Sequence, residues 1–100
     1  MGQGVALSTD LDDVNAIPYF LWDDPMTVGE LRRLLSTASE PERLRLLARV
    51  MREAKDTEVW KFTTLKEVVA LFPRLRPLLG RRLAFWDYLL GAWGELGLLP

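Results

Sequence analysis

Apolar residues recur three and four positions apart over most of the chain after residue 27, which is the spacing of amphipathic helices. Three of these stretches open with the pattern Ser/Thr-x-x-Glu. In such a capping box the hydroxyl accepts a hydrogen bond from a free amide of the first turn, and the glutamate reaches back to another. The three pairs are Thr27 with Glu30, Ser39 with Glu42, and Thr64 with Glu67. The pattern therefore predicts three helix starts at these points.

The apolar spacing also indicates how far each helix extends. It predicts helices over about residues 28–36, 40–54 and 65–72. Pro73 and Pro77 are expected to limit residues 72–79 to short helical turns, because proline lacks the amide that a helix interior requires. Gly80 is a natural stop after those turns.

A last helix is predicted over about residues 81–96, and it is apolar around nearly its whole circumference. Its large or apolar side chains are Leu83, Phe85, Trp86, Leu89, Leu90, Ala92, Trp93 and Leu96. A helix that is apolar all round must be covered all round. Two arrangements satisfy this requirement: the helix runs through the centre of the domain, or a partner or a second copy covers one side.

The first part of the chain has a different character. Residues 1–16 are rich in Gly, Ser and Asp, which predicts a flexible or loosely docked leader. The apolar run from Ile17 to Trp22 is interrupted by Pro18, so we expect an extended or single-turn segment that anchors itself by its aromatic rings. The last helix should pack centrally, against the aromatic anchor Tyr19–Trp22 and against Trp60 and Phe62.

These elements together predict an all-α fold. We expect one compact domain of four or five short helices over residues 17–100, with a mostly apolar C-terminal helix.

Composition removes several kinds of chemistry. The 100 residues contain no Cys and no His, which excludes disulfides, thiol or imidazole catalysis and the usual zinc sites. No Gly-rich phosphate loop is present, and the adjacent pairs Asp12-Asp13 and Asp23-Asp24 diverge instead of forming an acid–base couple. We therefore expect no catalytic residue, no metal and no cofactor.

The charges are unevenly distributed along the chain. Residues 1–30 hold six acids and no base, whereas all 13 bases lie in residues 31–100. Either the two halves pair within the fold, or the basic part meets a polyanion or an acidic protein surface. The chain shows no secretory signal and no long uncharged apolar stretch, so we expect a cytoplasmic protein without a membrane partner.

Four arginines gather around the two prolines and the glycine: Arg74, Arg76, Arg81 and Arg82. They either cap the carbonyls of the preceding turn or contact a partner rich in phosphate or carboxylate. Residues 64–93 also have the outline of a helix-turn-helix. Its second helix, however, is lined by Phe and Trp and not by polar groups that read bases.

Several segments recur as a set in a known group of proteins. The segments are Phe20-Leu21-Trp22-Asp23, Arg52-Glu53-Ala54, Val59-Trp60, Phe62, the helix from Leu65 to Leu71, Arg81, Phe85-Trp86 and Leu89-Leu90-Gly91. Over residues 17–93 the chain resembles small all-helical bacterial proteins that are often encoded beside nucleotidyltransferase toxins of the abortive-infection type. The resemblance implies the antitoxin or accessory half of such a pair, and it transfers no catalytic residue.

The favoured hypothesis is a non-enzymatic protein-binding module, antitoxin-like, whose partner is a nucleotidyltransferase toxin. Its partner-binding residues would be Phe85, Trp86, Tyr88 and Trp93, with Arg81 and Arg82 supplying charge. One alternative is a DNA-binding transcriptional regulator that uses Arg74, Arg76, Arg81 and Arg82 on phosphates. Another is a structural homodimer closed through the last helix.

Overall fold

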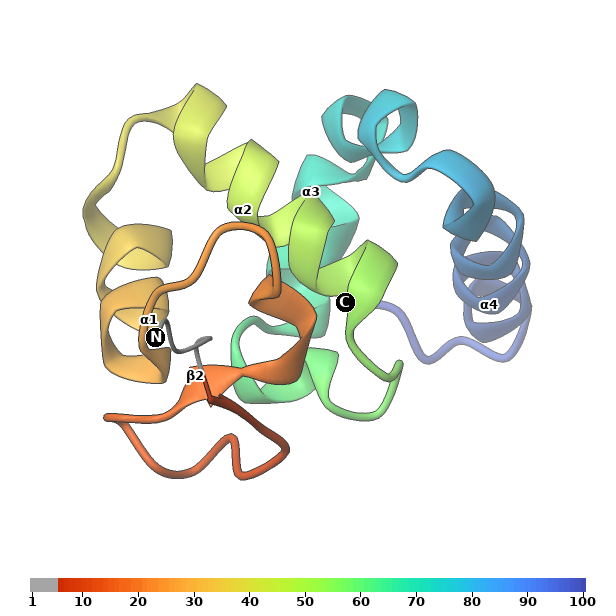
Figure 1. Ribbon diagram of the computed structural model, residues 1–100. Helices are drawn as coiled ribbons and strands as arrows, with labels where there is room; N and C mark the ends of the chain where they lie inside the picture. Colours follow the sequence, from red (N-terminus) through yellow and green to blue (C-terminus); the bar gives the residue numbers. More distant parts are fainter. Residues whose placement is uncertain (1–5) are drawn as a thin grey trace.

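The computed structural model describes residues 6–100 and is built mostly from helices (Figure 1). The α-helices are α1 (Val28–Thr37), α2 (Glu40–Glu53), α3 (Leu65–Leu75) and α4 (Leu83–Glu95). Short 3-10 turns connect them: η1 (Tyr19–Leu21), η2 (Val59–Lys61), η3 (Arg76–Leu78) and η4 (Gly80–Arg82). The prediction of an all-α domain with four or five short helices is confirmed.

The helices begin where the capping pattern predicts. The hydroxyls of Thr27 and Thr64 each accept a hydrogen bond, 3.1 Å long, from the amides of Glu30 and Glu67. Ser39 precedes α2 as expected, but its side chain makes no capping hydrogen bond. The predicted hydroxyl cap is therefore confirmed for α1 and α3 and is wrong for α2.

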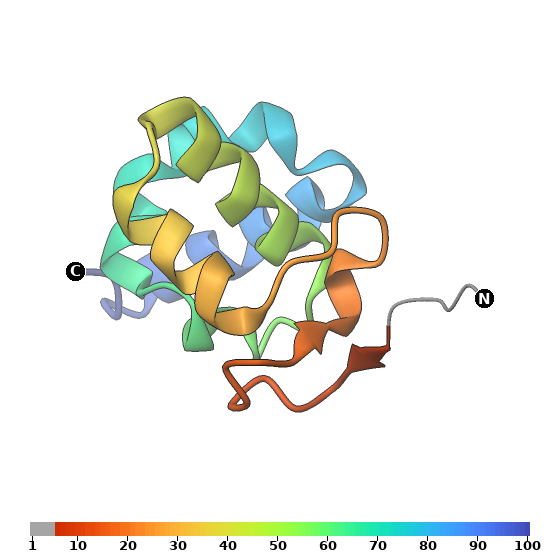
Figure 2. The same cartoon turned by 60° about the vertical axis from the view of Figure 1, so that its left-hand side comes forward.

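The helix at the centre of the fold is α2. Its residues Leu46, Leu47, Ala48, Val50 and Met51 are buried, and it contacts α1, α3, η1 and η4. Figure 1 shows α2 crossing the middle of the molecule, with α4 at one edge, and Figure 2 shows α1 and α2 together from another side. The prediction that the last helix packs centrally is therefore wrong.

One side of α4 nevertheless packs tightly on the body. Trp86 is fully buried, and its indole N–H donates a 2.9 Å hydrogen bond to the carbonyl of Met51 in α2. Trp60 meets the ring of Trp86 edge-on at 5.9 Å between centroids and lies 6.1 Å from that of Trp93. The expected packing of the last helix against Trp60 is confirmed.

The chain between α3 and α4 departs from the expected breaks. α3 continues through Pro73 to Leu75, although Pro73 cannot donate the helical hydrogen bond. Leu75 and Leu79 are both fully buried, and their burial compensates for the lost bond. Gly80 has a φ of 53°, the left-handed conformation expected of a helix stop.

The segment before η1 is packed, which corrects the prediction of a flexible leader over residues 1–16. Residues 1–5 lie outside the described part of the chain. Leu11 is only 2% exposed and belongs to the core. The amides of Val28 and Gly29 donate to the carbonyls of Ala16 and Val14, at 2.9 and 3.0 Å. Burial of one leucine and pairing with the first turn of α1 hold residues 6–16 in place.

A short parallel pair completes this packing. β1 (Leu7–Ser8) lies beside β2 (Ile17–Pro18), with Leu7 opposite Ile17. The pair brings the beginning of the described chain back to the segment that leads into η1.

Candidate partner surface

The acidic first part of the chain pairs with bases of the helical body. Asp12 lies 3.0 Å from the ammonium of Lys61, Asp24 lies 3.4 Å from the guanidinium of Arg45, and Asp23 pairs with Arg49. Of the two alternatives that the charge distribution allowed, the structure has pairing within the fold.

Arg49 of α2 organises the segment after η1. Its Nε donates a 3.0 Å hydrogen bond to the carbonyl of Phe20, and its guanidinium lies 5.6 Å from the ring centroid of Trp22. The hydrogen bond from Arg49 holds the pKa of Asp23 below its ordinary value of 3.8.

Phe20 is buried as an anchor should be, but Trp22 is 62% exposed, so only part of the predicted aromatic anchor enters the core.

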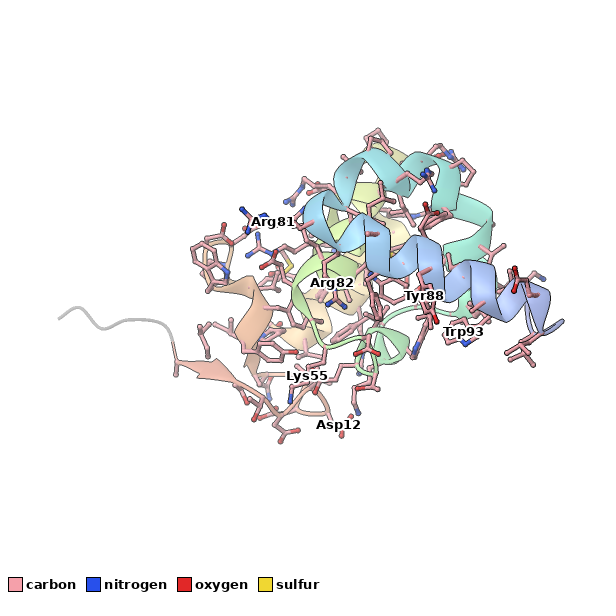
Figure 3. All side chains as sticks on the ribbon, turned by 90° about the vertical axis from the view of Figure 1, so that its right-hand side faces the viewer. Asp12, Lys55, Arg81, Arg82, Tyr88 and Trp93 are labelled. Atoms are coloured by element: carbon pink, nitrogen blue, oxygen red, sulfur yellow. The ribbon has the colours of Figure 1, made fainter. Side chains whose placement is uncertain are left out.

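The four aromatic residues expected to meet a partner are placed very differently. Trp86 is fully buried, so its assignment to a partner surface is wrong. Phe85 and Trp93 are partly buried, since each packs on another aromatic ring of the core. Tyr88 is 75% exposed. Figure 3 shows Tyr88 and Trp93 along α4, beyond Arg81 and Arg82 at its start.

The side of α4 that faces away from the body is here called the outer flank. It consists of Ala84, Asp87, Tyr88, Gly91 and Glu95, all exposed. Its small and charged residues explain why α4 needs no cover all round: Ala and Gly contribute little apolar surface. A Cβ added at Gly91 would meet no heavy atom within 4 Å, so the flank is open there.

An apolar groove runs between the outer flank and α3. Its volume is about 360 Å³, and the ion pair of Arg76 with Asp87 lines it together with the apolar residues Val69, Phe72, Pro73, Leu90 and Leu99. Beyond the end of α4, Leu96 is 70% exposed and Leu98 is 59% exposed. We call the outer flank, this groove and these two leucines together the α4 surface.

The four arginines of the predicted cluster do not form one basic patch. Arg74 pairs with Glu40, and Arg76 pairs with Asp87. The guanidinium of Arg82 lies 4.4 Å from the ring centroid of Phe85, and its Nε is buried without a hydrogen-bond partner among residues 6–100.

Arg81 is exposed beside Arg82 at the start of α4. Of the four arginines, these two make no ion pair within the described chain, whereas Arg76 lines the groove.

Comparison with protein-family models, with curated proteins and with solved structures found no match to this chain. Within residues 6–100, none of the helices combines the length and apolar character needed to cross a membrane. The same residues contain no group of three or more carboxylates that could hold a metal ion. A proposal of function therefore depends on the surfaces described above.

Proposed function

We propose that this protein is a non-enzymatic protein-binding module that engages its partner through the α4 surface. The observation that carries the proposal is the exposure of Tyr88, Leu96 and Leu98 beside an apolar groove. Large exposed apolar side chains rimmed by charged residues, here Asp87 and Glu95, are typical of an interaction site. Tyrosine is also among the residues that contribute most binding energy at protein interfaces.

The roles of the aromatic residues follow from their burial. Tyr88 presents its ring to the partner, whereas Phe85 and Trp93 support α4 from below and Trp86 fastens it to α2. Arg81 at the start of the helix and Arg82 over Phe85 provide positive charge at one end of the surface. An acidic patch on the partner would complement them and accelerate association.

The partner class that we propose is a nucleotidyltransferase toxin, with this chain as its antitoxin-like partner. The support for that class is the sequence resemblance described above. The support for the interface is the α4 surface, and the two parts can fail independently.

The test is binding of the purified chain to the toxin encoded beside its gene, with Gly91→Lys as the variant. Gly91 lies at the middle of the outer flank and has open space around it, so a lysine there should leave the fold intact. We expect the affinity to fall by about tenfold or more, because a charged side chain must then be buried at the interface. Calorimetry or surface plasmon resonance measures the change.

Thr37→Lys is the matched control. Thr37 is an exposed residue at the end of α1, and α1 lies on the opposite side of the molecule from α4 (Figure 1). Equal affinities of Gly91→Lys and the parent chain, with unchanged unfolding, would remove the α4 surface as the interface. Absence of binding by the parent chain would contradict the toxin as partner.

The two rival functions predict other results. If the partner is a second copy of this chain, light scattering should find a dimer, and the Gly91→Lys variant should be a monomer. A DNA-binding regulator predicts binding to duplex DNA that weakens steeply with salt. The DNA-binding proposal is the weaker one, because the outer flank of α4 carries Asp87 and Glu95 and no base.

A further inference from the structure

We infer that a basic depression where α1, α2 and the η2–α3 connection meet binds a small molecule that carries an oligophosphate group. The depression has a volume of about 480 Å³. Three cationic side chains line it, Arg32, Arg43 and Lys61, together with three hydroxyls, Ser36, Thr63 and Thr64. None of these residues belongs to the α4 surface, so the inference is independent of the proposed function.

The three cations come from three different elements and are held in different ways. Arg32 of α1 lies 5.4 Å from the ring centroid of Phe62 and donates a 3.5 Å hydrogen bond to the carbonyl of Leu11. These contacts fix the direction of its guanidinium before any ligand arrives. Preorganised arginine is well suited to phosphate, because its planar fork donates two parallel hydrogen bonds.

Lys61 and Arg43 are the cations that a ligand can recruit. Lys61 pairs with Asp12, whose side chain is 78% exposed. Such a surface pair is weak and exchanges readily for a more highly charged anion. Arg43 of α2 makes no ion pair within residues 6–100, so its charge is available to the depression.

Two of the three hydroxyls, those of Thr63 and Thr64, lie where α3 begins, and Ser36 belongs to α1. Thr64 caps α3, and the first turn of a helix carries free amides and the positive end of the helix dipole. The hydroxyl of Thr63 donates a 2.5 Å hydrogen bond to Oε1 of Glu67, the one carboxylate among the lining residues. Three lining cations against one lining carboxylate give two net positive charges once a ligand has displaced Asp12 from Lys61.

Charge and size together select the ligand class. Two net positive charges match an anion with at least two negative charges better than a single carboxylate group. The volume lies within the range of about 300–1,000 Å³ that is usual for small-molecule sites and exceeds what one phosphate fills. An oligophosphate, free or attached to a nucleoside, satisfies both requirements.

The test is isothermal titration calorimetry of the full chain with inorganic tripolyphosphate, with ATP and with adenosine. We expect both phosphates to bind at low salt, more weakly as salt is raised, and adenosine not to bind. Equal affinities for the two phosphates identify the oligophosphate itself as the ligand, and tighter binding of ATP identifies a nucleotide. No binding of either phosphate at millimolar concentration would overturn the inference.

Variants localise the binding. Arg43→Gln should lower the affinity by about tenfold, which is the effect of losing one charge-assisted hydrogen bond. Arg33→Gln is the control, since Arg33 neighbours Arg32 in sequence but does not line the depression and pairs with Glu30. An equal loss in both variants would place the binding elsewhere and overturn the inference.

Glu67→Gln gives a result that misfolding cannot mimic. The amide oxygen can still accept the hydrogen bond from Thr63, while the negative charge that opposes the ligand is removed. We expect tripolyphosphate to bind more tightly to this variant than to the parent chain. An unchanged or lower affinity would contradict the proposed site, as would binding of single-stranded DNA without binding of either small phosphate.

Discussion

The two helices that meet at Trp86, α2 and α4, differ in how apolar they are and in where they lie in the fold. α4 is the more apolar helix, yet only Trp86 and Leu90 are buried in it, and it lies at the edge of the fold. α2 carries four arginines along its length, yet it buries a continuous stripe and contacts α1, α3, η1 and η4 as well as α4.

The difference shows that the number of apolar residues does not decide which helix is central. A helix becomes central when its apolar stripe meets neighbours on several sides while its long polar side chains reach outward. The arginines of α2 do this: Arg45 and Arg49 extend to the acidic segment before α1. The side of α4 away from the body has no such long basic side chains, and its small residues leave it open.

The largest effect is expected at the side chain that joins the two helices. Trp86→Ala should lower the free energy of unfolding by about 3–5 kcal/mol, because it empties a large buried volume and leaves the carbonyl of Met51 without its donor. Tyr88→Ala, on the outer flank, should change it by no more than about 0.5 kcal/mol. Urea unfolding followed by circular dichroism measures both, and similar losses would show that α4 is covered on both sides.

The next largest effect on the free energy of unfolding is expected when an alanine is replaced by leucine, first in α2 and then in α4. Ala48→Leu in α2 should cost about 1–3 kcal/mol, because Ala48 is fully packed and added methyl groups force neighbours to move. Ala84→Leu on the exposed side of α4 should be close to neutral. If Ala48→Leu were tolerated as well as Ala84→Leu in thermal unfolding, α2 would not be the tightly packed centre.

A smaller, stabilising effect is expected from Gly91→Ala. Glycine in a helix interior is less favourable than alanine by about 0.5–1 kcal/mol, and nothing stands near the added methyl group. The variant should therefore unfold at higher urea concentration. A decrease in stability would mean that the backbone at Gly91 is closely approached, in contrast to the open flank described here.

The smallest effect is expected on the stability of the fold at acidic pH. Hydrogen bonds from Arg49 and Arg45 hold the pKa values of Asp23 and Glu42 below their ordinary 3.8 and 4.5. A carboxyl whose folded pKa is lowered adds stability above its unfolded pKa and loses it as the pH falls through the folded pKa. We expect stability to decline below about pH 4.5.

Asp23→Asn should make the decline with acid shallower, with circular dichroism at a series of pH values as the measurement. Glu95→Gln on α4 is the control, because Glu95 makes no ion pair within residues 6–100. If stability fell with decreasing pH in the same way in Asp23→Asn and in the parent chain, the pairing of Arg49 in α2 with Asp23 would add nothing to stability.

The candidate site could be predicted only in part from the sequence. The sequence pointed to α4 and to Tyr88, which is exposed, but also to Trp86, which is buried. Periodicity shows that both residues lie on an apolar helix, and it does not show which side faces Met51 of α2, 35 positions earlier. The basic depression had no sequence signal, since its three cations come from separate elements.

The sequence by itself determined where α1 and α3 begin, because a capping hydroxyl and the first turn lie within three residues of each other. It also determined the stop at Gly80, since a left-handed backbone conformation favours glycine locally. Only the tertiary structure decided that α2 is central, that residues 6–16 are packed and that the acidic segment pairs with α2. Those outcomes depend on burial and ion pairs between residues far apart in the chain, and local patterns carry no information about which distant surfaces meet.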